Sequence, residues 1–328
     1  MHRSPGFAAK DYKRTRPDAT TPPPGDAWPP LPLAQWQDTY ATLHMWTQIV
    51  GKTRLALAPM ENHWWNVALY VTPRGLTTSA MPLGNRTFAA DFDFIDHQLY
   101  VRDSRGASAA IPLVPQSVAD FYAAWQETLR SLAIDVRIMP VPVEVQTAIP
   151  FAEDREHAAY DADAAHRCWR ILVQADRVLK RFRGQFLGKA SPVHFFWGSF
   201  DLAATRFSGR PAPRHSGGAP HCPDYVMVEA YSHECASCGF WPGGGALAEP
   251  AFYAYAYPEP AGYADHPVRP QEARYHRDMR EFILPYEAVR LASDPDAALL
   301  DFVQSTYGAA ADLGRWDRAA LERTPGNT

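Results

Sequence analysis

Two stretches of the chain show the same order of elements: an amphipathic helix, a run of short strands and a closing helix. In the first stretch, apolar residues recur at three- and four-residue steps from Leu33 to Val50 and again from Val118 to Leu132, which is typical of helices with one buried face. Gly51 is the predicted C-cap of the first helix, and Ser117, in a Ser-x-x-Asp sequence that resembles a capping box, is the predicted start of the second. The strands predicted between the helices are Arg54–Ala58, Trp64–Val71, Gly75–Ser79, Phe88–Phe94, Leu99–Arg102 and Ala109–Val114. Their short connections favour antiparallel neighbours, so residues 33–150 are predicted to form one α+β half.

Residues 151–328 repeat this order. A long basic helix is predicted from Asp161 to Phe186, and a closing helix begins at Asp294-Pro295, where an N-cap is followed by proline at the first helical position. The strands predicted between them are Val193–Arg206, Ser232–Phe240, Phe252–Tyr257 and Phe282–Leu284. The predicted fold class is therefore α+β, with two similar helix–antiparallel sheet–helix halves.

Local sequence suggests that one half is a copy of the other. Val50-Gly51-Lys52 is matched by Leu187-Gly188-Lys189, and His63-Trp64-Trp65 by His194-Phe195-Phe196. Two interpretations stay open: an ancient duplication, or the chance recurrence of common helix ends and strand patterns.

The N-terminal stretch has a different composition. Residues 1–32 contain eight prolines, including the run Pro22–Pro24. Such a segment buries too little apolar surface to offset the entropy lost on ordering, so a disordered or extended arm is predicted there. It should be removable with little loss of stability.

Charge and composition narrow the class of protein. The chain has 32 basic and 36 acidic residues, a formal net charge of -4, and no basic excess of the kind that nucleic-acid binders show. No apolar run is long enough to span a membrane, and the N-terminus lacks the apolar core of a signal peptide. We therefore expect a cytoplasmic protein without a nucleic-acid or membrane partner. The sequence leaves its oligomeric state open.

Several common enzyme classes are also disfavoured. The sequence contains no Walker loop, G-x-G-x-x-G, G-x-S-x-G or H-E-x-x-H motif. P-loop enzymes, typical dinucleotide-binding folds and α/β-hydrolases are therefore poor candidates.

Polar residues gather on two predicted strands of the second half. His194, Asp201 and Arg206 lie on the first, and His233 and Glu234 on the next. If these strands pair, His233 or Glu234 comes within reach of Asp201 or Arg206, because cross-strand neighbours stand about 5 Å apart. We predict that the five residues converge on a ligand. The structural alternative is a salt bridge between Asp201 and Arg206, or an exposed ladder of ion pairs.

Two metal sites are conceivable. His63 and His194 hold matching places in the two halves, and two histidines that converge with a carboxylate can bind a divalent metal ion. The alternative is that both are hydrogen-bonded core histidines. Cys235 and Cys238 have zinc-knuckle spacing, and Cys222, His221 and His233 are near enough in sequence to complete four ligands. The alternative is reduced thiols, as expected in the cytoplasm.

These residues lead to a functional hypothesis. We expect a small-molecule enzyme whose cleft between the halves has Trp64, Trp197 and Trp241 as apolar walls. His194, Asp201, His233 and Glu234 would be the catalytic groups, with His233 or Glu234 as general acid or base, and Arg206 would hold an anionic group of the ligand. The alternative is a non-catalytic ligand-binding or regulatory module that uses the same cleft. A third, structural reading predicts no pocket.

The chain resembles an uncharacterised bacterial family, domain-of-unknown-function family 5996. The matching strings are Thr42–Lys52, Asn62–Trp65, Pro192–Leu202, Thr205–Gly209, Tyr231–Glu234 and Gly239–Gly243. The resemblance extends from about Trp28 to Leu321 and implies no known activity. It also implies that Cys222 and Cys235 are not fixed cysteines, which counts against the zinc knuckle.

Overall fold

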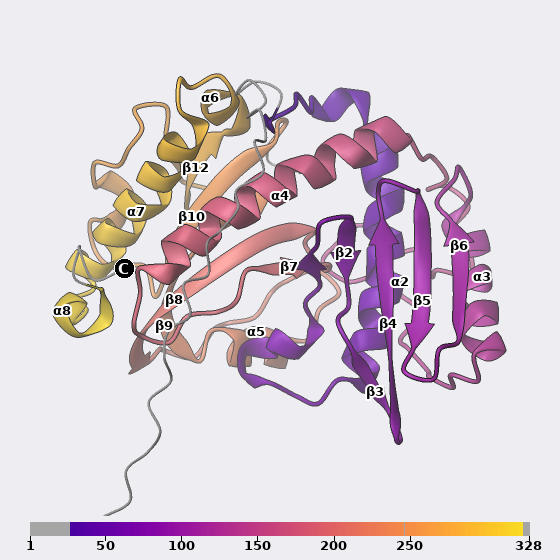
Figure 1. Cartoon of the computed structure of the whole chain (residues 1–328). Helices are drawn as coiled ribbons and strands as arrows, with labels where there is room; N and C mark the ends of the chain where they lie inside the picture. Colours follow the sequence, from indigo (N-terminus) through magenta and orange to yellow (C-terminus); the bar gives the residue numbers. More distant parts are fainter. Residues whose placement is uncertain (1–26, 246, 324–328) are drawn as a thin grey trace, which may run out of the picture.

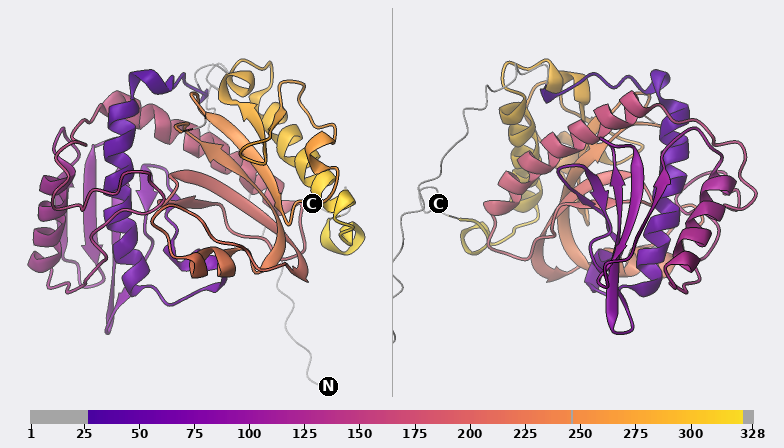
Figure 2. Two further views of the ribbon diagram at one scale, coloured as in Figure 1. Left: turned by 180° about the vertical axis from the view of Figure 1, so that it is seen from behind. Right: turned by 45° about the vertical axis from the view of Figure 1, so that its right-hand side comes forward.

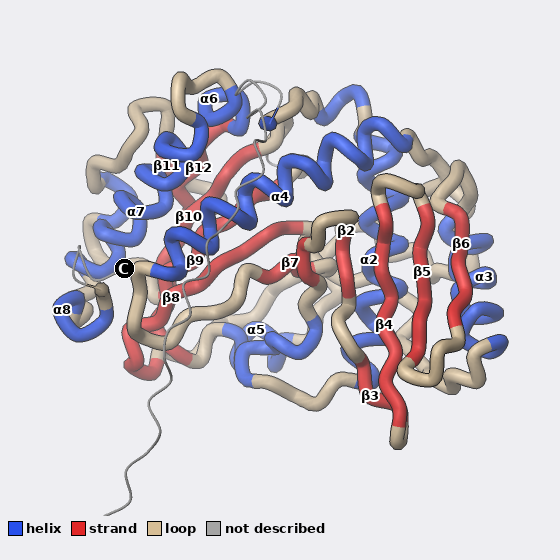
Figure 3. Tube along the Cα trace, in the orientation of Figure 1, coloured by secondary structure: helices blue, strands red, loops and turns tan. Residues whose placement is uncertain are grey.

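The computed structural model describes residues 27–245 and 247–323 and contains two antiparallel sheets of six strands each (Figure 1). The first sheet has the order β1-β2-β4-β5-β6, with β3 also paired to β4, and the second has the order β11-β12-β10-β9-β8-β7. Helices and sheets alternate along the chain as the α+β prediction requires (Figure 3). The predicted fold class is confirmed at this level.

The first half contains two long helices around the first sheet. Its elements are η1 (Leu33–Gln35), α2 (Gln37–Leu57), η2 (Asn62–Val67), β1 (Tyr70–Val71), β2 (Gly75–Thr77), β3 (Met81–Leu83), β4 (Arg86–Asp93), β5 (Gln98–Asp103), β6 (Ser108–Pro112) and α3 (Val118–Ser131). Ser117 caps α3 by accepting a hydrogen bond from the backbone N–H of Asp120, as the sequence predicts.

The second half is larger and has more helices. Its elements are α4 (Ala162–Gly184), β7 (His194–Phe196), β8 (Asp201–Pro211), α5 (Asp224–Ala230), β9 (His233–Trp241), β10 (Ala251–Tyr257), η3 (Tyr263–Asp265), β11 (Arg274–His276), β12 (Glu281–Pro285), α6 (Tyr286–Arg290), α7 (Pro295–Leu313) and α8 (Arg318–Leu321). Asp294 caps α7 through the N–H of Ala297, with Pro295 in the first turn, as predicted. The ribbon views show α4 crossing the molecule from α2 to α7 (Figure 2).

Helix α2 extends further than predicted. It continues through Gly51 to Leu57, so the predicted C-cap at Gly51 and the predicted strand Arg54–Ala58 are both wrong. Gly51 stays inside the helix because another part of the chain lies against it: a Cβ at this position would come 2.2 Å from Cδ1 of Trp197. The glycine therefore allows a close approach rather than ending the helix.

The strand predicted over Val193–Arg206 is a hairpin. Residues 197–200 turn the chain between β7 and β8, and Phe200 has a φ of 58° in this turn. The prediction treated the stretch as one strand because its alternating side chains continue through the turn. Strands β3 and β11 and helix α5 were also missed.

The two sheets are joined at their edges. Leu69 and Phe195 exchange two backbone hydrogen bonds of 2.9 Å, next to β1 and within β7. The buried apolar residues form one large cluster that runs from Trp28 to Trp316 and includes residues of both halves. The halves therefore share a core.

The internal repeat has a different register from the predicted one. Hairpin β1–β2 pairs Val71 with Leu76 around the turn 72–75, and hairpin β7–β8 pairs Phe196 with Asp201 around 197–200. Aligning the two hairpins sets His194 against Leu69 rather than against His63. The two halves still share the same order of elements, so the duplication stays a prediction. The residues that would correspond are Leu69 and His194 rather than His63 and His194.

The predicted arm over residues 1–32 is too long. Residues 1–26 lie outside the described residues, whereas Trp28 and Leu31 are 2% and 1% exposed. The Trp28 ring lies 6.1 Å from that of Phe252, and the Tyr286 hydroxyl donates a 2.7 Å hydrogen bond to the Pro29 carbonyl. These apolar residues place 27–32 in the fold despite the prolines around them.

Among the helices described, none combines the length and the apolar character needed to cross a membrane.

Candidate functional site

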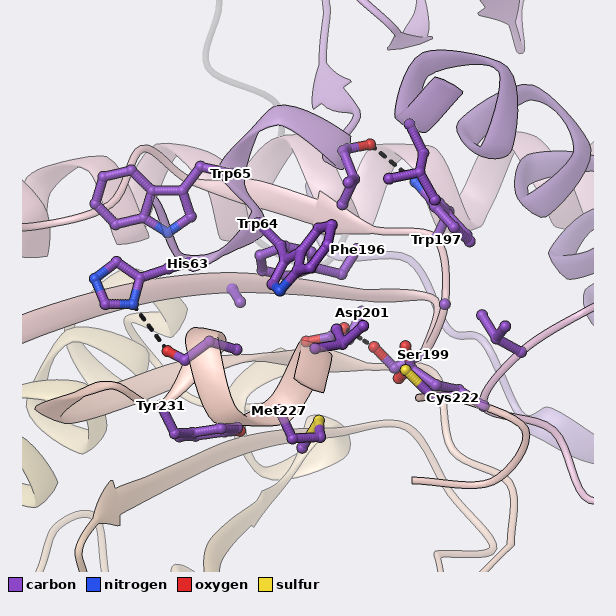
Figure 4. Close-up of a pocket in the computed structure, with 18 of the residues that line it drawn as sticks. His63, Trp64, Trp65, Phe196, Trp197, Ser199, Asp201, Cys222, Met227 and Tyr231 are labelled. Atoms are coloured by element: carbon purple, nitrogen blue, oxygen red, sulfur yellow. Dashed lines mark hydrogen bonds between the residues drawn. The ribbon is translucent and has the colours of Figure 1, made fainter. Parts of the chain in front are cut away.

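A cavity of about 760 Å³ lies between the two halves (Figure 4). Its walls come from α2, η2, the connecting segment 139–144, the β7–β8 turn, strands β8 to β10, and α5 with the residues before it. A mostly apolar cavity of this size is typical of small-molecule sites.

The floor of the cavity is one face of the second sheet. Asp201, Ala203 and Thr205 alternate along β8 and line the cavity. The Thr205 hydroxyl is 2.9 Å from that of Ser237 on β9. Side chains alternate along a strand, which places these three on one face of the sheet, and the pairing of β8 with β9 extends that face.

Asp201 is held in a fixed position. It is 8% exposed, and its two carboxylate oxygens accept hydrogen bonds from the hydroxyls of Ser199 and Tyr253. Burial raises the pKa of Asp201, and the two hydroxyls oppose this rise. Because both oxygens are occupied, Asp201 contributes charge and position rather than a free acceptor.

Glu144 provides a second, unpaired carboxyl group. Its side chain lines the cavity and, within the part of the chain that the structure describes, forms no hydrogen bond or ion pair. The Glu144 side chain is exposed to solvent at the cavity wall, and partial desolvation by the surrounding protein together with the nearby Asp201 raises its pKa to about 7, while Lys52 opposes the rise. The carboxyl group lies against Gly198, where a Cβ would come 2.2 Å from Glu144 Oε1.

The backbone around Glu144 is anchored to helix α2. The side chain of Gln48 accepts a 2.9 Å hydrogen bond from the N–H of Val143 and donates one of 2.8 Å to its carbonyl. The N–H of Glu144 donates a 2.8 Å bond to Pro220, and Glu144 has a φ of 57°. These bonds hold a conformation that is uncommon for a residue other than glycine.

Lys52 brings an amine to the cavity from α2. It is 4% exposed, and its Nζ lies 5.7 Å from the centroid of the Trp197 ring. No hydrogen-bond or ion-pair partner for this amine exists among residues 27–245 and 247–323. Burial lowers the pKa of Lys52 to about 8, while Cys222 and Glu144 partly restore it.

Aromatic rings form the apolar side of the cavity. Figure 4 shows Trp64 and Phe196 next to each other above the group formed by Asp201, Ser199 and Cys222. The indole N–H of Trp197 donates a 2.8 Å hydrogen bond to the Val67 carbonyl, which fixes that ring.

Of the predicted residues, Asp201, Trp64, Trp197 and His63 line the cavity. His63 and Trp64 are consecutive residues with φ near +60°. Such a pair is unusual outside glycine and directs both rings from η2 toward the second half.

His194 does not line the cavity. It is 0% exposed and is enclosed by the rings of Trp65, Tyr70 and Phe196, whose centroids lie 5.8, 5.6 and 5.3 Å away. Neither of its ring nitrogens has a hydrogen-bond partner in the described structure. Burial lowers the pKa of His194 to about 3, so it is neutral at ordinary pH.

Arg206 also has a structural position. Its guanidinium group lies 3.5 Å from the centroid of the Phe182 ring and 4.3 Å from that of Tyr307, and it donates a hydrogen bond to the Phe182 carbonyl. Arg206 is therefore buried between the second sheet and helices α4 and α7, and it cannot hold a ligand in the cavity.

His233, Glu234 and Trp241 lie outside the cavity lining. Strand β8 pairs Phe207 with Cys235 and Pro211 with His233, with an irregularity between them, so His233 and Glu234 meet the far end of β8. Glu234 forms an ion pair of 2.6 Å with Arg210 and accepts a 2.8 Å hydrogen bond from Ser208. Trp241 is at the opposite end of β9, paired with Ala251. The predicted convergence of five residues is therefore wrong.

His63 and His194 do not form the predicted metal pair. His63 Nδ1 is 2.9 Å from the Ala230 carbonyl and therefore donates to it, while Nε2 is 2.8 Å from the amine of Lys189 and accepts from it. Both nitrogens of His63 are thus occupied. Among the described residues, no three of the types His, Cys, Asp and Glu are grouped so as to hold a metal ion.

The cysteines do not gather as a zinc knuckle. Cys235 lines the cavity, whereas Cys238 lies on the other face of β9 with its thiol 3.6 Å from the Ala204 carbonyl. Cys222 also lines the cavity, and burial together with Glu144 raises its pKa to about 11, so its thiol is protonated at neutral pH.

Sequence reasoning missed Lys52, Glu144 and Tyr253. Lys52 lies in α2 just beyond the predicted end of that helix, and Glu144 lies in a connecting segment to which no function was assigned. The alternation Val143-Glu144-Val145 was a local signal, because it sets a single acid between two apolar residues.

A protein-family model, described as a family of unknown function (DUF5996), matches residues 28–323 of the chain. The match begins at Trp28, the first buried tryptophan of the fold. Comparison of the chain with curated proteins and with solved structures found no match.

Proposed function

The chain belongs to DUF5996, whose members have no assigned function, and we propose from its own site that it is an enzyme acting on a small, mostly apolar molecule bound between the halves. The observation that carries this proposal is the unpaired carboxyl group of Glu144 at the solvent-accessible wall of an aromatic cavity, which Asp201, a buried carboxylate with both oxygens hydrogen-bonded, also lines.

The two carboxyl groups suit different tasks. Glu144 has a pKa of about 7, which is suited to a general acid or base because both of its forms are populated near neutral pH. Asp201 supplies the neighbouring negative charge that keeps this pKa high, and Ser199 and Tyr253 hold it in place. Titratable groups kept unpaired in a cavity are more typical of function than of stability.

Trp64, Phe196 and Trp197 would contact the apolar body of the ligand. The four cysteines are unpaired thiols, which favours the cytoplasm as the proposed compartment. We keep a duplication of one ancestral half as the proposed origin of the two sheets.

Substrate depletion tests this function. The wild-type protein and Glu144→Gln are incubated with fractionated small-molecule extract, and mass spectrometry follows bound and consumed compounds. We expect the wild type to convert a compound that Glu144→Gln binds but converts about 10²- to 10⁴-fold more slowly. Glu127→Gln, on the exposed surface of α3, is the matched control and should behave as wild type.

Two other results have clear meanings. A compound that both proteins bind and neither converts would favour the binding or regulatory module. If no compound binds in the cavity, the proposed function is wrong.

A further inference from the structure

Lys52 is an unusual lysine. Lysine amines are ordinarily exposed or paired, because an unpaired ammonium group is costly to bury. Lys52 is 4% exposed, lines the cavity, and has no hydrogen-bond or ion-pair partner in the described part of the chain. A surface lysine of the same chain, Lys180, is instead paired with Asp176 at 2.6 Å.

The surroundings of Lys52 favour a neutral, reactive amine. The Trp197 ring, which Gly51 allows to approach α2, lies 5.7 Å from its Nζ and favours the charged ammonium form, whereas burial favours the neutral amine and is the larger effect. Burial lowers the pKa of Lys52 to about 8, so about a tenth of the amine is unprotonated at pH 7. An uncharged lysine in an apolar pocket is a nucleophile.

We propose that Lys52 forms a Schiff base with the carbonyl carbon of an apolar aldehyde or ketone bound in the cavity. This rests on the proposed function, since it requires that the cavity admits a small molecule, and it identifies the substrate class as carbonyl compounds.

The step balances without an oxidant or reductant. The lone pair of the Lys52 nitrogen forms a C–N bond as the C=O π pair moves to oxygen, and one of the two amine protons passes to that oxygen to give a carbinolamine. Glu144, as the carboxylic acid, donates a proton to the hydroxyl group, which leaves as water while the nitrogen electrons form the C=N bond. The nitrogen gives up its remaining proton, which returns to the Glu144 carboxylate.

The main alternative use of Lys52 is as a point charge for an anionic ligand. Glu144 and Asp201 line the same cavity, and the negative charge of Asp201 acts on the Glu144 carboxyl group. A carboxylate or phosphate on the ligand would be repelled by the Asp201 carboxylate, and by Glu144 whenever it is ionised, whereas a neutral carbonyl group would not. The charges around Lys52 therefore favour the carbonyl compound.

Reductive trapping tests the proposal. The full-length protein is mixed with cinnamaldehyde and sodium cyanoborohydride, and the adduct is located by peptide mapping. The chain has five lysines, so each site is resolved. We expect labelling of Lys52 at least tenfold faster than that of Lys180. Lys52→Arg should abolish the fast phase, and Lys180→Arg should leave it unchanged.

Other results separate the two proposals. Equal labelling of Lys52 and Lys180 would overturn the Schiff base; conversion of an extract compound by the wild type but not by Glu144→Gln would then still support the proposed function. If Lys52 is labelled no faster than Lys180, and cinnamic acid binds to Lys52→Arg as tightly as to the wild type but more weakly to Lys52→Met, Lys52 is an anion-binding residue and the Schiff base is wrong.

Discussion

His194 is buried with no hydrogen bond to either ring nitrogen, which makes it sensitive to acid. Its pKa falls to about 3 in the folded protein, whereas an unfolded histidine titrates at about 6.5. Below pH 6.5 the unfolded chain binds a proton that the folded chain does not. The free energy of unfolding is therefore unaffected by His194 above pH 6.5. It decreases as the pH falls from 6.5 toward 3, because protons bind preferentially to the unfolded chain.

We predict that His194→Leu reduces this acid sensitivity. The free energy of unfolding of the wild type should fall between pH 6.5 and pH 4 by about 1.4 kcal/mol per pH unit more than that of the variant. Urea denaturation at four pH values measures the difference. His266→Leu, at a half-exposed histidine, is the control and should keep the wild-type slope. Parallel slopes for His194→Leu would contradict the prediction.

Glu144 and Lys52 together set the pH dependence of the trapping reaction. Imine formation needs Glu144 protonated, with a pKa of about 7, and Lys52 neutral, with a pKa of about 8. The rate should therefore be bell-shaped with its maximum between about pH 7 and 8. The charged or titratable neighbours are Asp201 and Cys222, besides the pair itself.

Glu144→Gln should convert this bell into a single rising limb, because only the deprotonation of Lys52 then controls the rate. Initial rates of trapping from pH 5.5 to 9.5 measure both profiles. A wild-type rate that rises continuously to pH 9.5 would show that Glu144 does not act as the acid.

Among the site residues, sequence alone identified Asp201, Trp64 and Trp197. Asp201 could be found because alternation along β8 follows from local geometry. Lys52 and Glu144 could not, because their significance depends on which distant groups surround them: the Trp197 turn for Lys52, and Gly198 with Asp201 for Glu144.

At the level of elements, the Trp197 ring packs directly against helix α2 at Gly51, a contact that the helix sequence alone does not predict. Gly51 and Gly308 are both inside long helices, but a Cβ at Gly51 would come 2.2 Å from the Trp197 ring, whereas one at Gly308 would meet nothing within 4 Å. Helix propensity alone favours alanine at both positions by about 1 kcal/mol.

We predict that Gly51→Ala and Gly308→Ala change stability in opposite directions. Gly51→Ala should lower the free energy of unfolding by about 1–3 kcal/mol, because the added methyl group displaces Trp197. Gly308→Ala should raise it by up to about 1 kcal/mol. Chemical denaturation compares the two. A stabilised Gly51→Ala would mean that the Trp197 turn moves freely away from α2.

Element boundaries were predictable where side chains cap them and unpredictable where tertiary contacts decide. Ser117 and Asp294 cap their helices as predicted, since a cap needs only nearby backbone groups. The turn after β7 and the irregular pairing of β8 with His233 arise from the packing of the whole sheet, and no local pattern marks them. This missed register explains why His233 and Glu234 were expected at the site, whereas Arg206 lies on the other face of β8, against α4 and α7.

At the level of the whole molecule, residues 27–32 connect the N-terminal part of the chain to the second sheet. Trp28 packs on Phe252 and Tyr286, and Pro29 accepts the Tyr286 hydrogen bond. A chain that begins at Leu33 should therefore be less stable than one that begins at Ala27 by about 3–5 kcal/mol, the cost of removing a large buried aromatic side chain.

Thermal and urea unfolding of the two truncated chains measures this difference. Trp28→Ala in the chain that begins at Ala27 separates the contribution of the indole from that of the backbone. Equal midpoints for both truncations would contradict the packing role of Trp28.

The seam between Leu69 and Phe195 has a consequence for the time course of folding. Most strand pairs in both sheets join neighbours in the chain, whereas this pair joins residues more than a hundred positions apart. Closing so large a loop is entropically unfavourable, so the hairpins should form early and the seam late. The cavity is bounded by both sides of the seam and is therefore incomplete in the transition state. A ligand of the cavity should slow unfolding and leave the rate of refolding unchanged, which stopped-flow kinetics can measure.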